Sequence, residues 1–124
     1  MRMVSTFSFW LACGALLAAG FGPRMADAAI AIAFDPETGK ASAYNGSWDQ
    51  NQSNRAALDN CGRGCRIVAT GKGTCAAVVE AVSTGTYAWA VAYGSTTGAA
   101  ANSAWHECRR KGGVNCKTAV AICD

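Results

Sequence analysis

Cysteines are the residues of this sequence whose number and spacing indicate the clearest chemistry. The chain has 124 residues and seven cysteines, six of which lie in residues 29–124. An even number of cysteines in a short chain predicts a disulfide framework where the compartment is oxidising. A zinc site is the alternative, but there is no C-x-x-C pair, and the single histidine, His106, does not stand at a finger-like spacing. We therefore expect disulfides, and no metal or other cofactor, at Cys61, Cys65, Cys75, Cys108, Cys116 and Cys123.

Other residues that could take part in catalysis do not combine into a recognisable active site. Residues 71–74 (Gly-Lys-Gly-Thr) resemble a phosphate-binding loop, but Gly73 interrupts the required spacing. His106 and Glu107 are adjacent and point in different directions, and no nucleophile is evident as their partner. The sequence therefore favours a protein that is not an enzyme. A cryptic cell-wall hydrolase is the alternative, which needs carboxylates about 5–9.5 Å apart in a cleft, and its candidates are Asp35, Glu37 and Asp49.

A basic run and a tryptophan in a polar segment are the candidates for binding a partner. The run follows an expected helix, where cations also complement the helix dipole, and it could contact an acidic surface; it consists of Arg109, Arg110 and Lys111. Trp48 is the one large apolar residue in the polar stretch 47–53. Trp89 and Trp105 are instead expected in the core. The net charge of +3 is too low for a strongly basic nucleic-acid binder.

The first 28 residues have the features of a removable export signal. Arg2 supplies a positive charge, residues 7–21 are mostly apolar, and residues 26–28 (Ala-Asp-Ala) match the small-x-small cleavage pattern. The apolar run is shorter than a spanning helix requires, which is about 18–20 residues. The sequence thus predicts a signal peptide at residues 1–28 and one disulfide-stabilised domain at residues 29–124. We expect that domain in the periplasm or outside the cell, without stable membrane insertion.

Hydrophobic periodicity predicts two short helices. Two sets of residues recur at the i, i+3, i+4, i+7 spacing of one helix face, and they are Asn54, Ala57, Leu58 and Cys61, then Ala101, Ala104, Trp105 and Cys108. Each set is followed by a glycine-containing loop and a second cysteine. Only one leucine, Leu58, remains in residues 29–124, so an apolar core alone looks inadequate and the disulfides are expected to decide whether the domain folds.

The strands are predicted from alternation and turn residues. Residues 29–34 and 41–44 are expected to form a hairpin across the turn 35–39, which contains a proline and a glycine. Residues 66–70 and 117–122 read as short strands, and residues 76–82 as either strand or helix. Residues 87–93 alternate large apolar residues with alanine, which predicts a strand near the middle of a sheet, with its alanine side close to another layer.

The two halves of the domain show signs of an internal repeat. Residues 31–39 align with residues 90–98, and the two helix patterns align at an offset of 47. The resulting order predicts an α+β fold, a small two-layer disulfide-bonded domain with a sheet and two short helices. If a pseudo-twofold relates the halves, equivalent cysteines pair equivalently, which favours Cys61–Cys65 and Cys108–Cys116. Cys75–Cys123 would then join the halves.

This pattern resembles an exported bacterial family, the domain-of-unknown-function family 4189. The elements that carry the resemblance are an Ala-aromatic strand, an Ala-rich helix ending in Cys, a loop to a second Cys, a Cys-Ala-Ala motif, a second helix-Cys-loop-Cys unit and a terminal Cys. In this sequence they lie at residues 31–34, 55–61, 65–69, 75–77, 101–108 and 116–123. The resemblance implies the fold and supplies no catalytic residues.

The sequence as a whole favours a small exported protein that acts by binding or inhibition. The expected partner is a protein or an envelope surface, and not a nucleic acid. The cell-wall hydrolase and a purely structural envelope component are the alternatives.

Overall fold

The structure, a computed structural model, describes residues 28–83 and 86–124. Residues 1–27 of the predicted signal peptide lie outside the described residues. The elements are β1 (Ala29–Phe34), β2 (Ala41–Ser47), α2 (Gln50–Cys61), β3 (Arg66–Lys72), β4 (Cys75–Ser83), β5 (Thr86–Gly94), α3 (Thr97–Arg110) and β6 (Lys117–Cys123). No helix of the described residues is long and apolar enough to cross a bilayer.

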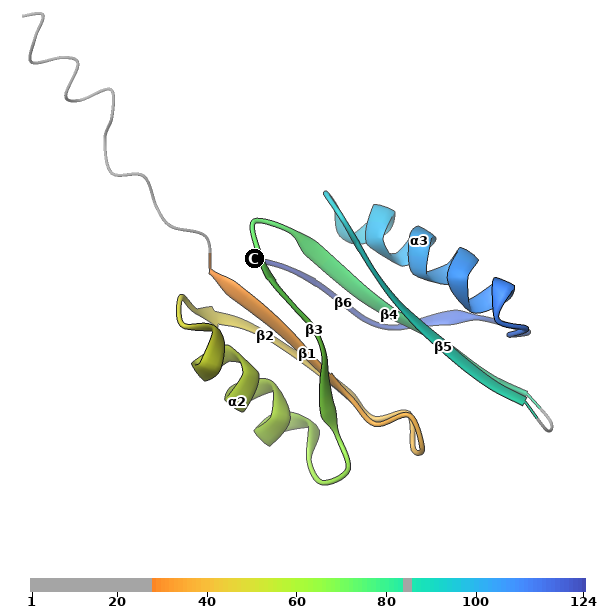
Figure 1. Cartoon of the computed structure of the whole chain (residues 1–124), viewed down its shortest axis with the longest axis horizontal. Helices are drawn as coiled ribbons and strands as arrows, with labels where there is room; N and C mark the ends of the chain where they lie inside the picture. The colour runs from red at the N-terminus through yellow and green to blue at the C-terminus, as the bar shows by residue number, and fades with distance from the viewer. Residues whose placement is uncertain (1–27, 84–85) are drawn as a thin grey trace, which may run out of the picture.

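The strands form two three-stranded antiparallel sheets that stack face to face. The strand orders are β2-β1-β3 and β5-β4-β6. The core between the sheets contains one face of β1 and one face of β4, with Ile30, Ile32, Phe34, Ala76 and Val78 fully buried. Helix α2 packs on β1 and β2, and α3 packs on β4 and β5, so the helices cover the two outer faces (Figure 1). The domain has four layers in the order helix, sheet, sheet, helix.

The predicted α+β class with two short helices is confirmed, and the layering is more elaborate than expected. Each helix with its sheet is a two-layer unit, but the six strands do not join into one sheet. Strand β5, expected near the middle of a sheet, lies at an edge, and β4 takes the centre. The alanine side of β5 does face another layer, because Ala88 and Ala90 are buried against Ala104 of α3.

Small residues let each helix approach its sheet closely. The fully or nearly buried positions are spaced by four residues in both helices, and they are Ser53, Ala57 and Cys61, then Ala100, Ala104 and Cys108. The buried face is therefore rotated from the predicted one. Trp105, expected in the core, is 36% exposed, and Leu58 is half-buried at the edge of the contact. A side chain larger than alanine at the centre of these faces would separate helix from sheet.

The three disulfides have the connectivity that the pseudo-twofold predicted. Cys61–Cys65 and Cys108–Cys116 each tie a helix end to the following strand. Cys75–Cys123 connects residues that are paired across β4 and β6. The expectation that this bridge joins the two halves is wrong, because both strands belong to the second sheet.

The two halves have the same order of elements and the same strand pairing. In the first half, β1 is central and pairs with β2 and β3, and α2 lies between β2 and β3 in sequence. In the second half, β4 is central and pairs with β5 and β6, and α3 lies between β5 and β6 in sequence. Ile32 pairs with Ala43 and Ala69, and Val78 pairs with Val91 and Val120. The register also shifts at Ile32/Ala33 in one half and at Val78/Val79 in the other. We call residues equivalent when they take the same place in these two ladders. By this criterion β1 is equivalent to β4, whereas the sequence had aligned it with β5.

Candidate functional site

The two sheets differ most at one end of the sandwich, which we call the turn end. It contains the turn between β1 and β2, the Cys61–Cys65 loop, the C-terminus of α3 and the start of β6 (Figure 1). Phe34 of β1 and its equivalent residue in β4, Glu80, lie on the inner faces here. Phe34 pairs with Ala41 and Arg66, and Glu80 pairs with Trp89 and Lys117. At this equivalent position one sheet has a fully buried phenylalanine and the other a half-buried carboxylate.

The Trp89 ring packs against Phe34 at this end of the core. The centroids of the two rings lie 5.1 Å apart. The guanidinium of Arg66 lies 5.6 Å from the indole centroid, and the ammonium of Lys111 lies 5.8 Å from it. Lys111 also donates a hydrogen bond of 3.0 Å to the Trp89 carbonyl oxygen. The core is thus closed around Trp89 on the edge strand, which leaves Glu80 beside open space.

That space is a cleft of about 780 Å³. One wall is the turn 36–39, and the other carries Glu80 of β4 and Tyr87 of β5, with Asn115 and Lys117 at the start of β6. The volume lies in the range of small-ligand sites, about 300–1,000 Å³. The turn, the β4–β5 hairpin and the start of β6 therefore supply two carboxylates, a phenol, an amide and an ammonium to one hollow.

Glu80 is held in place by the groups around it. The Tyr87 hydroxyl donates to Glu80 Oε1 at 3.1 Å. Desolvation, then the hydrogen bond to Glu80 and its charge, raise the pKa of Tyr87 well above its ordinary value. Tyr87 therefore stays a neutral donor throughout the physiological range. Gly39 has φ 80°, and a Cβ there would lie 3.1 Å from Glu80 Oε1, so glycine serves both the turn conformation and the close approach.

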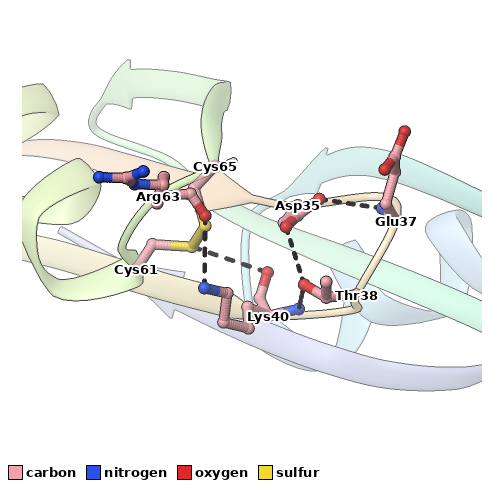
Figure 2. The surroundings of a disulfide bond; sticks show 7 residues. All are labelled: Asp35, Glu37, Thr38, Lys40, Cys61, Arg63 and Cys65. Atoms are coloured by element: carbon pink, nitrogen blue, oxygen red, sulfur yellow. Dashed lines mark hydrogen bonds between the residues drawn. A yellow bond between two sulfur atoms is a disulfide. The ribbon is translucent and has the colours of Figure 1, made fainter.

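The turn beside the cleft is built on Asp35, as Figure 2 shows. Its carboxylate accepts the Thr38 hydroxyl at 2.8 Å and the Glu37 amide at 3.0 Å. These hydrogen bonds, the one from Thr38 first, lower the pKa of Asp35 below its ordinary value. Lys40 fastens the turn to the neighbouring loop by donating to the Arg63 carbonyl oxygen at 3.3 Å. The Cys61–Cys65 disulfide thus supports one wall of the cleft.

The Thr38→Val substitution is expected to destabilise the protein at neutral pH and to lose that effect in acid. Because the pKa of Asp35 is lower in the folded state, its contribution is present above the unfolded value of about 3.9 and disappears as pH falls through the folded value. The substitution raises the folded pKa and removes this contribution. Urea unfolding between about pH 3 and pH 7 measures it. Thr38→Ser, which keeps the hydroxyl, should behave as wild type, and a deficit of the valine variant that is constant with pH would contradict the assignment.

The candidate hydrolase carboxylates are not assembled into one site. Asp35 is 6% exposed and holds the turn. Glu37 lines the cleft beside it. Asp49 lies at the opposite end of the sandwich, where its carboxylate accepts the Asn51 amide at 2.9 Å and caps α2. The first and third carboxylates therefore stabilise local backbone, and Glu37 alone faces the cleft.

The predicted partner-binding residues are also divided between the two ends. Trp48 is 50% exposed, next to the N-terminus of α2. The basic run lies at the C-terminus of α3, at the turn end. The Arg109 guanidinium lies 5.2 Å from the centroid of the Trp105 ring. Arg110 forms an ion pair with Glu107, and Lys111 donates its hydrogen bond to the backbone of β5. Trp48 and the run therefore do not form one continuous surface.

The remaining sequence candidates lie outside the cleft. Residues 71–74 form the end of β3 and the turn into β4, and the Thr74 hydroxyl donates to backbone carbonyl oxygens. The His106 ring packs edge-on against Trp105, 5.2 Å between centroids, on the exposed side of α3. In residues 28–83 and 86–124, no group of three or more His, Cys, Asp or Glu side chains could hold a metal ion.

The sequence analysis missed the residues of β4, β5 and β6 that line the cleft. Glu80 is the one charged residue within the apolar stretch Cys-Ala-Ala-Val-Val-Glu-Ala-Val. A charge on a strand whose neighbours at i−2 and i−4 are apolar is the signal that could have found it. Because residues 76–82 could be read as strand or helix, the face on which Glu80 lies was undefined.

Fold and cleft together define a small α+β domain with three disulfides and a polar cleft at its turn end. The family described as Domain of unknown function (DUF4189) matches residues 29–123. The chain belongs to this family, and the resemblance found in the sequence is confirmed. Comparisons with curated proteins and with solved structures found no match.

Proposed function

We propose that this protein is an exported, non-catalytic binding module, and that the cleft at the turn end is its ligand site. Three disulfides are typical of oxidising compartments outside the cytoplasm, which supports export. Two disulfides flank the site. Cys61–Cys65 supports the turn through Lys40 and Arg63, and Cys108–Cys116 ends one residue before Lys117. A rigid frame lowers the entropic cost of binding. The proposed ligand is part of another protein or a component of the cell envelope.

One observation carries the proposal, and it is the carboxylate of Glu80 on an inner sheet face. Its equivalent residue in the other sheet is the buried Phe34, and its neighbour on the same face, Val78, is fully buried. Glu80 is half-buried and is a charged residue that interrupts an otherwise apolar row on this face. Residues that break the local pattern without a gain in stability are expected at functional sites.

We also infer that the two halves are copies of one ββαβ unit. The identical strand pairing and the register shift at equivalent positions support this. In that case the two equivalent positions have diverged, to Phe34 in the first half and to Glu80 in the second. The cleft combines Glu80 of the second half with the turn 36–39 of the first half.

The test compares Glu80→Gln with Glu107→Gln in the oxidised protein, in an NMR screen of small polar fragments and envelope-derived peptides. Glu107 serves as the control because its partner is Arg110 on α3, and it does not line the cleft. We expect amide shifts to cluster at residues 36–39, 87 and 115–117, and Glu80→Gln to weaken binding at least tenfold without lowering the melting temperature. Glu107→Gln should bind as wild type. Shifts that cluster elsewhere, or no binding by any probe, would contradict the proposal.

A further inference from the structure

The charged groups of the cleft are not neutralised by the protein. Within residues 28–83 and 86–124, the single ion pair is Arg110–Glu107 on α3. Glu80 and Lys117 face each other across β4 and β6, but no nitrogen-to-oxygen distance between them is within 4.0 Å. The hydrogen-bond donor to Glu80 is the neutral hydroxyl of Tyr87. The cleft therefore presents separate negative and positive charges to solvent.

The arrangement of these charges has a defined polarity. Lys117 lies on the β6 side, directly opposite Glu80 on the central strand β4. Glu37 comes from the turn on the other wall. The lining of the cleft therefore contains two carboxylates, one on β4 and one on the turn, and one ammonium on the strand paired with Glu80. Such a set complements a ligand that carries both charges better than one that carries either alone.

The size and the polar groups of the cleft favour a ligand longer than a single amino acid. The cleft has about 780 Å³, and residues 36–39 of the turn, Asn115 and Tyr87 line it together with the charged residues. Backbone groups and amides are typical partners of peptide groups. Asn115 is held at a φ of 61°, which is uncommon for a residue other than glycine, so its position at the cleft is specified by the loop that Cys116 closes.

We propose that the cleft binds a short zwitterionic peptide with a free amino group and a free carboxylate. This inference rests on the proposed function and names its ligand class. The peptide ammonium lies between Glu80 and Glu37, its carboxylate lies at Lys117, and the peptide groups bond to the turn and to Asn115. Tyr87 orients the Glu80 carboxylate and, because it stays protonated, adds no negative charge.

The test uses three probes of the same length, which are triglycine, N-acetyl-triglycine without the amine and triglycine amide without the carboxylate. Binding to the oxidised protein is followed by NMR titration of the amides at residues 36–39, 87 and 115–117. We expect triglycine to bind at least tenfold more tightly than either blocked peptide. Glu80→Gln should weaken the binding of triglycine and of triglycine amide and leave the binding of N-acetyl-triglycine unchanged. Lys117→Met should weaken the binding of triglycine and of N-acetyl-triglycine and leave the binding of triglycine amide unchanged.

The outcomes separate this inference from the proposed function. Equal binding of all three probes in the cleft would overturn the zwitterion assignment and leave the cleft as a ligand site. Failure of all three, with other fragments still binding there, would also overturn the assignment alone. Failure of every probe and fragment at the cleft would overturn both. Circular dichroism of Glu80→Gln and Lys117→Met shows whether each variant is folded, and Tyr87→Phe, which removes only the hydroxyl, provides a second variant if either is not.

Discussion

Replacing Cys75 and Cys123 together by alanine is expected to lower the free energy of unfolding by about 4 kcal/mol. This bridge has a sequence separation of 48, against 4 for Cys61–Cys65 and 8 for Cys108–Cys116. In the chain-entropy model a longer closed loop restricts the unfolded state more, which predicts about 4 kcal/mol for the long loop and about 2–2.5 kcal/mol for each short one. The loss is comparable to the whole stability of many domains of this size.

The measurement is urea unfolding of the double variant beside the matched variant in which Cys61 and Cys65 are replaced by alanine. Alanine is a suitable replacement at both bridges because Cys75 and Cys61 are buried, and alanine is small and apolar. We expect the variant without the long bridge to be unfolded or nearly so at 37 °C, and the control to remain folded with a lower midpoint. If removing the short bridge costs as much as removing the long one, loop entropy is not the main contribution of these disulfides.

Substituting Ala104 by leucine is expected to destabilise the protein by about 3 kcal/mol. Ala104 is fully buried at the centre of the α3 face, packed against Ala88 and Ala90 of β5. No space is left for three further carbon atoms, so the helix must move away from the sheet or the side chain must adopt a strained rotamer. Leucine has a helix propensity close to that of alanine, so the loss reports packing and not helix formation.

The control for this substitution is Ala99→Leu in the first turn of the same helix. Ala99 is exposed, and we expect a change within about 0.5 kcal/mol. Thermal and urea unfolding of the two variants give the comparison. Equal stability of the Ala104 and Ala99 variants would show that α3 can shift on its sheet without cost, contrary to the close packing described above.

Local patterns in the sequence were sufficient for several features of the fold. The turn at residues 35–39 follows from its proline and glycine, and the strand Ala29–Phe34 follows from strict alternation. Both helices were found because apolar or small residues recur at helical spacing over several turns. The cysteine pairing followed from the order of cysteines in the two halves. Each of these signals lies within a short stretch or in a count of residues.

The exact buried face of each helix could not be predicted from such patterns. Alanine is compatible with a buried and an exposed position, so an alanine-rich helix has a weak amphipathic signal. Trp105 and Leu58 were placed on the core side because they are large and apolar. In the structure the sheet lies so close that only small residues fit beneath the helix, and the large residues lie at or outside its border. Steric fit between layers outweighs hydrophobicity here.

What the sequence determined by itself was the two helices, the strands other than β4, the family and the cysteine pairing, since these depend on local periodicity, residue spacing and cysteine order. Tertiary structure decided that six strands form two stacked sheets, that β4 and not β5 is central, and that Glu80, Tyr87, Asn115 and Lys117 share one cleft with the turn. The physical reason is that strand partners and sheet faces are selected by contacts between residues far apart in the chain. A one-residue change of register reverses the face on which every side chain lies, and no local pattern specifies that choice.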